Sequence, residues 1–256
     1  MNFIFDIDGT ICFKGEPVSQ LIQEELLKLR EQGHVVGFAS ARPCRDMLPV
    51  LDKRLHDCLM IGANGAMTYY NHELVQLNFI PQSILEQLIS MSSKHKASYL
   101  IDLAWDYHYA GDRSHPFLAK VDPSGLAASV NLTTETKAAK FLVTSCMDAA
   151  ALQQDLAALP ITIHHHSDEE IVDITAEAVD KMVALRQFGI QEGQFICFGN
   201  DTNDLPMFCH AAYSVMIGDH LGLQKIASEQ IRMGSDTEDQ ILTALSRFST
   251  EAATSH

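Results

Sequence analysis

Short apolar runs recur along the first part of the chain, and each ends beside small or polar residues. The runs cover Asn2–Ile7, His34–Ala39 and Cys58–Ile61. A short run bounded in this way is typical of a strand that is buried on both faces. We therefore expect three buried strands in this part of the chain.

Amphipathic segments separate these runs. Ile22, Leu26 and Leu29 recur with the spacing of one helix face, and a glycine follows, so a helix is expected over Ser19–Gln32. A second helix is expected over Arg45–Arg54. Strands that alternate with helices predict a parallel sheet with right-handed crossovers and helices on both faces.

The alternation breaks at Asn64-Gly65, a dipeptide that favours a tight turn. Met67–Tyr70 and Leu74–Phe79 follow it and are expected to form an antiparallel hairpin. Beyond Pro81, helices and strands no longer alternate one for one, which is typical of an α+β module. The elements expected there are helices over Ile84–Lys94 and Asp148–Ala158 and strands over Ser98–Leu103, Lys140–Thr144 and Ile161–His165.

The alternation returns in the last third of the chain. The elements expected there are strands over Ile171–Ile174, Gln194–Phe198 and Ser214–Ile217 and helices over Asp180–Phe188, Asp204–His210, Leu221–Ala227 and Glu238–Phe248. The pattern therefore predicts an α/β core made of residues 1–80 and 171–256, split by an inserted α+β domain over residues 81–170.

Charge and composition narrow the classes of partner. The 256 residues carry a net charge of −15, and such a surface repels nucleic acid, which we do not expect as a partner. No apolar run is long enough to span a membrane, and the first residues lack the basic segment of a signal peptide. The six cysteines form no CxxC pair, which favours reduced thiols and a cytoplasmic location.

Two carboxylates follow the first expected strand. Asp6 and Asp8 are two residues apart and so point to the same side of an extended chain. Ligands of open α/β sheets bind at this end of the strands. Neighbouring carboxylates are costly unless a cation offsets their charge or one stays protonated, and both arrangements are useful in catalysis.

Other polar groups are expected near the same edge. Ser40 ends the second strand, and its hydroxyl and the N–H groups around Ala41 and Arg42 are suited to an anionic oxygen, although such a serine is more often a helix cap. Lys181 begins a helix, where a positive charge opposes the helix dipole. The segment Gly199–Asp204 adds carboxylate and amide oxygens of the kind that Mg²⁺ prefers.

The order of four segments resembles the haloacid dehalogenase-type phosphatases. The segments are DIDGT at Asp6, SARP at Ser40, the single Lys181, and GNDTND at Gly199. The NGA turn at Asn64 and the single insertion are similar to the Cof-type branch with its type IIB cap. The resemblance covers nearly the whole chain and implies a doubly wound, Rossmann-like parallel core sheet with an inserted α+β type IIB cap domain.

The resemblance also implies a role for each matched residue. Asp6 is the implied nucleophile that forms an aspartyl-phosphate, and Asp8 the implied general acid and then base. The residues implied to bind phosphate are Ser40, Ala41, Lys181 and Asn203. Those implied to hold Mg²⁺ are Asp6, Asp8 through its carbonyl, Asn200, Asp201 and Asp204.

Two positions depart from the family's pattern. Asn200 stands where the family usually has an aspartate, so one negative charge beside the metal is lost, and Asp201 is a candidate to compensate. Ser40 and Ala41 stand where the family usually has threonine and glycine. The serine keeps the hydroxyl, whereas alanine does not share glycine's tolerance of positive φ.

The expected function is that of a Mg²⁺-dependent phosphomonoester hydrolase acting on a small phosphorylated metabolite, such as a sugar phosphate, a nucleotide or a phosphorylated cofactor. Two alternatives stay open. One is a phosphotransferase or phosphomutase of the same fold, and the other is a catalytically weakened phosphate-binding protein, which Asn200 motivates. The sequence determines neither the substrate nor the oligomeric state.

The insertion carries two further patterns. Trp105, Tyr107 and Tyr109 alternate and are expected on one face of a strand, either in the core of the cap or as a platform that stacks on substrate. The tract from His164 to His166 resembles a metal-binding tract, but only its first and last members share a strand face, and zinc needs more ligands.

Overall fold

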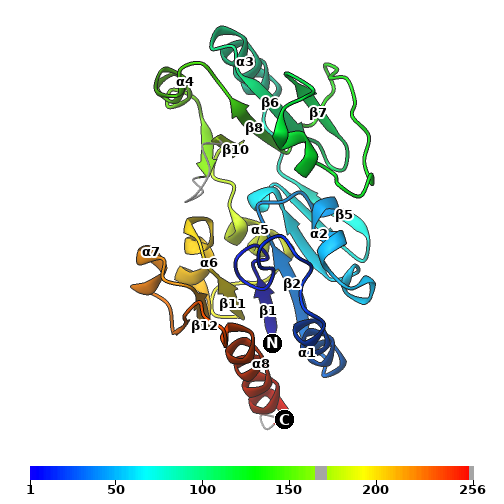
Figure 1. Cartoon of the computed structure of the whole chain (residues 1–256), viewed down its shortest axis with the longest axis vertical. Helices are drawn as coiled ribbons and strands as arrows, with labels where there is room; N and C mark the ends of the chain where they lie inside the picture. The colour runs from blue at the N-terminus through cyan, green and yellow to red at the C-terminus, as the bar shows by residue number, and fades with distance from the viewer. Residues whose placement is uncertain (165–171, 254–256) are drawn as a thin grey trace.

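The computed structural model describes residues 1–164 and 172–253, which form two lobes. The lower lobe in Figure 1 holds both ends of the chain and an eight-stranded sheet, and the upper lobe holds a five-stranded sheet. We call the lower lobe the core and the upper lobe the cap. No helix in the described ranges combines the length and the apolar character that a membrane span requires.

The core sheet is parallel through six strands, and a hairpin extends one edge. Its strand order is β13-β12-β11-β1-β2-β3-β4-β5, and β4 and β5 are antiparallel. The strands are β1 (Asn2–Phe5), β2 (Val35–Ala39), β3 (Leu59–Gly62), β4 (Met67–Tyr70), β5 (Glu73–Leu77), β11 (Phe195–Gly199), β12 (Tyr213–Ile217) and β13 (Glu229–Ile231). The expected doubly wound sheet and the expected hairpin are thus confirmed.

Helices cover both faces of the core sheet because the residues of its central strands alternate between two apolar clusters. Phe3 and Phe5 of β1 pack in the cluster that includes α1 and α8, whereas Ile4 packs in the cluster that includes α5 and α6. The core helices are α1 (Gln20–Glu31), α2 (Cys44–Met47), α5 (Lys181–Phe188), α6 (Leu205–His210), α7 (Leu221–Gln224) and α8 (Thr237–Ala253).

The cap is an antiparallel sheet with two helices on one face. Its strand order is β7-β6-β8-β10-β9, and α3 and α4 pack against one apolar cluster of the sheet. The elements are α3 (Gln82–Lys94), β6 (Ser98–Asp102), β7 (Tyr107–Ala110), β8 (Lys140–Ser145), α4 (Ala149–Leu156), β9 (Ile161–His164) and β10 (Val172–Ala176). The expected α+β insertion is confirmed as a separate sheet.

Two expected elements differ from the structure. The helix expected over Arg45–Arg54 is α2 followed by two short 3₁₀ segments, Leu48–Val50 and Lys53–Leu55, because Pro49 supplies no N–H to continue a helix. The strand expected over Ile171–Ile174 as the return to the core is wrong in its placement. Its counterpart β10 pairs with β8 and β9 in the cap sheet, and residue 171 itself lies outside the described residues.

Candidate active site

The candidate site lies where β1, β2 and β11 end. These strands are parallel neighbours, so the residues that follow them meet at one edge of the sheet. Asp6 directly follows β1, Ser40 follows β2 and Asn200 follows β11. Lys181 also lies at this edge. It is the first residue of α5, and the Asp180 side chain caps that helix.

Lys181 joins two carboxylates from distant parts of the chain. Its Nζ donates to Oδ1 of Asp6 at 2.8 Å and to Oδ1 of Asp204 at 2.6 Å. All three residues are buried, with at most 4% of any of them exposed. The ammonium group of Lys181 thus pairs with two carboxylates. The three side chains together carry one excess negative charge when both carboxylates are ionised.

Burial and charge shift the pKa values of this trio. Burial raises the pKa of Asp6 to about 7, against the lowering effect of Lys181 and with a further rise from Asp204. Burial alone lowers a lysine pKa, but Asp204 and Asp6 outweigh it and hold the pKa of Lys181 above its usual value. Lys181 is therefore a permanent cation, suited to holding an anionic oxygen.

The loop after β11 is ordered by its own side chains. The Oδ2 atom of Asp204 accepts from the N–H groups of Asn200 at 2.8 Å and Asp201 at 3.1 Å. Oδ1 of Asp201 accepts from the N–H of Thr202 at 2.7 Å and lies 3.9 Å from Nε2 of His220. The Asp201 side chain also accepts from the N–H of Asp204, which together with the Asp204 contact to the Asp201 N–H forms a capping box. The Asp201 carboxylate thus has a structural task at the start of the Thr202–Asp204 turn.

Thr10 links Asp6 to Asn200. Its hydroxyl lies 2.9 Å from Oδ2 of Asp6 and 3.2 Å from Oδ1 of Asn200. Gly9 has a φ of +74°, and a Cβ at this position would overlap the Asn200 amide. The glycine of the DIDGT segment therefore lets the Asn200 side chain approach the first loop.

Asp8 forms an ion pair with Arg42. Nε of Arg42 lies 2.7 Å from one carboxylate oxygen of Asp8 and Nη2 lies 2.5 Å from the other. The Asp8 side chain is 49% exposed, in contrast to buried Asp6. The two aspartates of the segment therefore differ in environment, and such a difference allows two carboxylates to take different chemical roles.

The expected phosphate-binding residues lie around this edge. Oγ of Ser40 accepts from the N–H of Arg42 at 3.1 Å, which orders the turn after β2. Asn203 donates through Nδ2 to Oδ1 of Asn64 at 3.0 Å. The N–H of Asn64 in turn donates to the carbonyl of Ser40 at 3.0 Å. The two loops are thus joined through the NGA turn.

Gly65 explains why the NGA turn lies beside Lys181. It has a φ of +103°, and a Cβ there would overlap the carbonyl of Asp180, the residue that caps α5. The bare backbone of Gly65 therefore allows α5 to begin directly against the turn, which brings Lys181 to the sheet edge.

The side chains of three contributors to the site were not assigned a role from the sequence. Thr10 and Arg42 stand inside the quoted segments, so their positions were available but their contacts were not. Asn64 was noted as the start of a turn, and its φ of +55° fits that role, yet its buried side chain also bridges to Asn203. The one feature of the sequence that points to these three residues is that each lies within or beside a motif.

The patterns in the insertion have structural partners. Nε1 of Trp105 donates to the carbonyl of Leu126 at 2.7 Å, and its ring packs edge-on to Tyr69 of the core. Tyr107 and Tyr109 pack on an apolar cluster of the cap, which favours the core-packing interpretation of this aromatic face. His164 contacts Oγ1 of Thr175 at 2.8 Å, and the rest of the histidine tract, for which a metal role was not favoured, falls on residues 165 and 166, outside the described residues.

The atoms at the sheet edge suit a hard divalent cation. The carboxylate of Asp6 and the amide oxygen of Asn200 converge on Thr10, and Asp8 lies two residues after Asp6 in the loop that follows β1. Within residues 1–164 and 172–253, no three His, Cys, Asp or Glu side chains form a metal site by themselves, so a metal here depends on amide and backbone oxygens too. The excess negative charge around Lys181 also fits a cation.

Comparison with known proteins decides the family. The model of the haloacid dehalogenase-like hydrolase family matches residues 3–245. The chain belongs to this family. The predicted resemblance to its Cof-type, subclass IIB members is confirmed, and the chain is a phosphatase of this superfamily.

Similar proteins are distant in sequence but extend over most of the chain. YkrA of Bacillus subtilis (strain 168), provisionally named a phosphatase, is 25% identical over 224 residues, with 84% of each chain covered. The HMP-PP phosphatase of Serratia proteamaculans (strain 568) is 23% identical and covers 92% of this chain and 90% of its own length.

A solved structure shares the whole two-lobed fold. The subclass IIB sugar phosphatase BT4131 superposes with a TM-score of 0.76 at 20% identity, over 96% of this chain and 98% of that one. At this identity the likeness establishes the fold. It confirms the prediction of a parallel core sheet with a separate cap of type IIB.

Proposed function

We propose that this protein is a Mg²⁺-dependent phosphomonoester hydrolase that works through a phosphorylated Asp6. The observation that carries the proposal is the pairing of buried Asp6 with Lys181 at the carboxyl edge of the parallel strands. The carboxylate is available as a nucleophile, and the fixed ammonium offsets the charge of an incoming phosphoryl group.

In the first step, a carboxylate oxygen of Asp6 forms a bond to phosphorus while the bond from phosphorus to the leaving oxygen breaks. The electron pair goes to the leaving oxygen, and Asp8 supplies the proton that makes it an alcohol. Asp8 is suited to this task because its half-exposed side chain can take up a proton from solvent before it protonates the leaving oxygen. Lys181 and the loops of Ser40 and Asn203 hold the non-bridging oxygens.

In the second step, Asp8 accepts a proton from water, and the water oxygen attacks phosphorus. The bond between phosphorus and Asp6 breaks, which restores the carboxylate and releases orthophosphate. Arg42, which lies against both oxygens of Asp8, keeps the carboxylate in position for this role as base.

The residues that we propose to hold Mg²⁺ are Asp6 by its carboxylate, Asp8 by its carbonyl and Asn200 by its amide oxygen, with Asp204 behind them. Asp201 was an expected ligand, but its capping contacts favour a structural role instead. When bound, the metal offsets the repulsion between the carboxylate nucleophile and the phosphoryl oxygens.

The substrate class that we propose is a small phosphorylated metabolite. Relatives of this chain are named for such compounds. One is the 5-amino-6-(5-phospho-D-ribitylamino)uracil phosphatase YitU of Bacillus subtilis (strain 168), which is 20% identical over 238 residues and 86% of this chain. The HMP-PP phosphatase and the sugar phosphatase BT4131 are others. Nucleic acid stays outside the proposal because of the net charge of −15.

Orthophosphate release from p-nitrophenyl phosphate tests the hydrolase proposal. We expect turnover that depends on Mg²⁺ and disappears in Asp6→Asn. Absence of metal-dependent turnover in the parent protein would support the phosphate-binding alternative. Turnover that needs an added alcohol or sugar phosphate as acceptor would support the phosphotransferase alternative.

The role of Asp8 has its own test. We expect Asp8→Asn to slow the hydrolysis of an alkyl phosphate far more than that of p-nitrophenyl phosphate, because an activated leaving group needs little protonation. Equal losses on both substrates would remove Asp8 from the role of general acid.

A further inference from the structure

Among the residues that the structure describes, four buried charged side chains lie at the interface between cap and core. The cap contributes Asp102, Lys140 and Asp173, and the core contributes Arg45. Their exposed fractions are at most 5%. Buried charges of this kind destabilise a protein unless they are paired, so their partners indicate what the interface requires.

The cap charges face the core because of strand alternation. Asp102 and Lys140 are directly opposite each other on β6 and β8, and Asp173 lies opposite Leu142 on the next strand. The intervening residues, such as Ile101, Phe141 and Ile174, pack on the side of α3 and α4. The three charges therefore share the face that is turned away from the cap helices.

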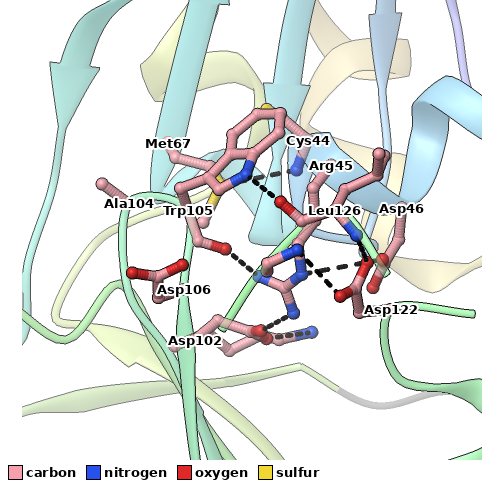
Figure 2. A network of polar contacts seen from close by, with 12 residues as sticks. Cys44, Arg45, Asp46, Met67, Asp102, Ala104, Trp105, Asp106, Asp122 and Leu126 are labelled. Carbon is pink, nitrogen blue, oxygen red and sulfur yellow. Dashed lines mark hydrogen bonds and ion pairs between the residues drawn. The ribbon is translucent and has the colours of Figure 1, made fainter. Parts of the chain in front are cut away.

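Arg45 and Asp102 form an ion pair between the lobes. Nη2 of Arg45 lies 2.6 Å from Oδ1 of Asp102, and Nη1 donates to the carbonyl of Trp105 at 2.8 Å. Figure 2 shows the guanidinium between these two cap residues, with Asp46 and Asp122 on its other side. This pair holds the cap on the core without a contact to the phosphate-binding loops described above.

Lys140 does contact a phosphate-binding loop. Its Nζ donates to the carbonyl of Ala41 at 2.9 Å, and it lies 3.5 Å from Oδ2 of Asp173 and 3.8 Å from Oδ2 of Asp102. The Ala41 carbonyl belongs to the same peptide group as the N–H of Arg42. That N–H donates to Oγ of Ser40 at 3.1 Å, so a cation on the oxygen fixes the peptide and, through it, the Ser40 hydroxyl that is expected to face phosphate.

Asp173 connects Lys140 to the second loop. Its Oδ2 atom accepts from Nδ2 of Asn64 at 3.0 Å, and Oδ1 of Asn64 accepts from Asn203 at 3.0 Å. The Asp173 carboxylate is therefore the start of two chains of polar contacts, which we call arms. The first arm runs through Lys140 to Ala41, and the second runs through Asn64 to Asn203.

We propose that Lys140 and Asp173 are positioning residues, which order the two phosphate-binding loops when the cap is closed. The proposal rests on the proposed function for its catalytic consequence. In the closed arrangement the cap fixes the Ala41 peptide and the Asn203 side chain. When the cap lifts, the Ala41 carbonyl loses Lys140, and Asn64, which holds Asn203, loses Asp173. Tight phosphate binding is thus tied to closure.

The test uses inorganic phosphate as the probe, because it has no leaving group for the cap to contact. Phosphate affinity is measured by calorimetry in the presence of Mg²⁺, and kcat and KM are measured with p-nitrophenyl phosphate. The variants are Lys140→Met, Asp173→Asn and the pair Lys140→Met with Asp173→Leu. Tyr69→Phe is the control, because it removes a hydrogen bond to the cap carbonyl of Ala104 that touches neither loop.

We expect Lys140→Met to weaken phosphate binding by about tenfold or more, the loss of one hydrogen bond from a charged donor. Asp173→Asn keeps an acceptor oxygen and is expected to lose less. The paired variant removes both charges together, so it keeps the test valid if Lys140→Met alone does not fold. Tyr69→Phe is expected to bind phosphate as the parent protein does.

Phosphate affinity within about twofold of the parent in a folded Lys140 variant would overturn the proposal, since a change this small is within the scatter of independent sites. An equal loss in Tyr69→Phe would also overturn it, because the effect would then follow from any weakened interface. If the parent protein binds phosphate without hydrolysing esters, the proposed function fails, and the affinities still decide the role of Lys140.

Discussion

Two buried clusters of charge occupy this molecule, and their composition differs. At the sheet edge, Lys181 lies between Asp6 and Asp204, so one cation serves two carboxylates. At the interface, Arg45 and Lys140 lie among Asp102 and Asp173, so the charges balance. Balanced charges stabilise each other where they are, whereas an excess of one sign leaves room for a further charged group.

The difference in net charge separates a cluster that is suited to binding a ligand from a cluster that joins the two lobes. The edge cluster has an unmatched negative charge and oxygen donors, which suit Mg²⁺ followed by a phosphoryl group. The interface cluster is complete without a ligand and joins the two lobes. Burial of charge alone therefore does not mark a catalytic centre, whereas uncompensated charge at the ends of parallel strands makes the edge cluster the candidate.

The largest effect is expected for Asp6→Asn. The amide is close in shape to the carboxylate but is not a nucleophile toward phosphorus, so orthophosphate release should fall by at least about 10⁴-fold. A thermal melt of the variant checks that it is folded. Substantial turnover by the folded variant would contradict the role given to Asp6.

Loss of the cation should distinguish the two clusters by stability. Lys181→Met leaves Asp6 and Asp204 buried without their cation, and we expect a loss of about 3–5 kcal/mol in the free energy of unfolding. Arg45→Met leaves Asp102 within 3.8 Å of Lys140, so its loss should be smaller. Denaturant melts with and without Mg²⁺ measure both.

Addition of Mg²⁺ should affect the stability of the two variants differently. It should restore part of the stability of Lys181→Met, because a cation can replace the ammonium at the sheet edge. Its effect on Arg45→Met should be smaller, because Lys140 still lies beside the two carboxylates that remain there, Asp102 and Asp173. A similar Mg²⁺ response in both variants would show that the distinction between the clusters is wrong.

Asp46 tests excess charge at the rim of the interface. Its side chain is 13% exposed and lies 3.6 Å from Nε of Arg45. Burial raises its pKa to about 6, opposed by Arg45 and reinforced by Asp102 and Asp122. Ionising Asp46 therefore costs more in the folded state than in the unfolded state, so its unfavourable effect appears as the pH rises from about 4 to above 6.

Asp46→Asn should remove this pH dependence. We expect the variant to gain about 2 kcal/mol in unfolding free energy over the parent between pH 4 and pH 8, after allowance for solvent screening. Denaturant melts at the two pH values measure the gain. A gain that is equal at both pH values would mean that Asp46 keeps an ordinary pKa in the folded protein.

The smallest effect is expected from the metal-site variants. Asn200→Asp adds a negative charge beside the proposed cation, so Mg²⁺ affinity, measured by calorimetry, should rise by about tenfold or more. Asp201→Asn is the matched control, because an asparagine also caps a helix turn. If Asp201→Asn weakened Mg²⁺ binding as strongly, Asp201 would be a ligand after all.

The sequence predicted the edge cluster because its residues follow strands. The apolar runs that end near Asp6, Ser40 and Gly199 indicate parallel neighbours, and the ends of such strands meet. Even Lys181 was detected as an unusual cation in a first helical turn. The order of these segments then resembled a known family, which supplied the roles.

The interface cluster was not predictable in this way. Lys140 and Asp173 stand in cap strands without a motif, and their partners depend on how the cap lies on the core. The strand containing Asp173 was even expected in the core sheet, because an apolar strand carries no mark of the sheet that it joins. Arg45 was expected only as the first residue of a helix, which Pro49 shortens, and no motif marked its side chain. Contacts between domains are a property of the assembled fold.

The most direct test of the central claim is detection of the phosphorylated aspartate. Asp8→Asn is mixed with p-nitrophenyl phosphate and Mg²⁺, quenched in acid during turnover, digested, and analysed by mass spectrometry. Because the variant lacks the base for the second step, we expect one phosphoryl group on Asp6 and none in a variant that also carries Asp6→Asn. Continued p-nitrophenol release with no phosphoryl group on Asp6 would contradict the account.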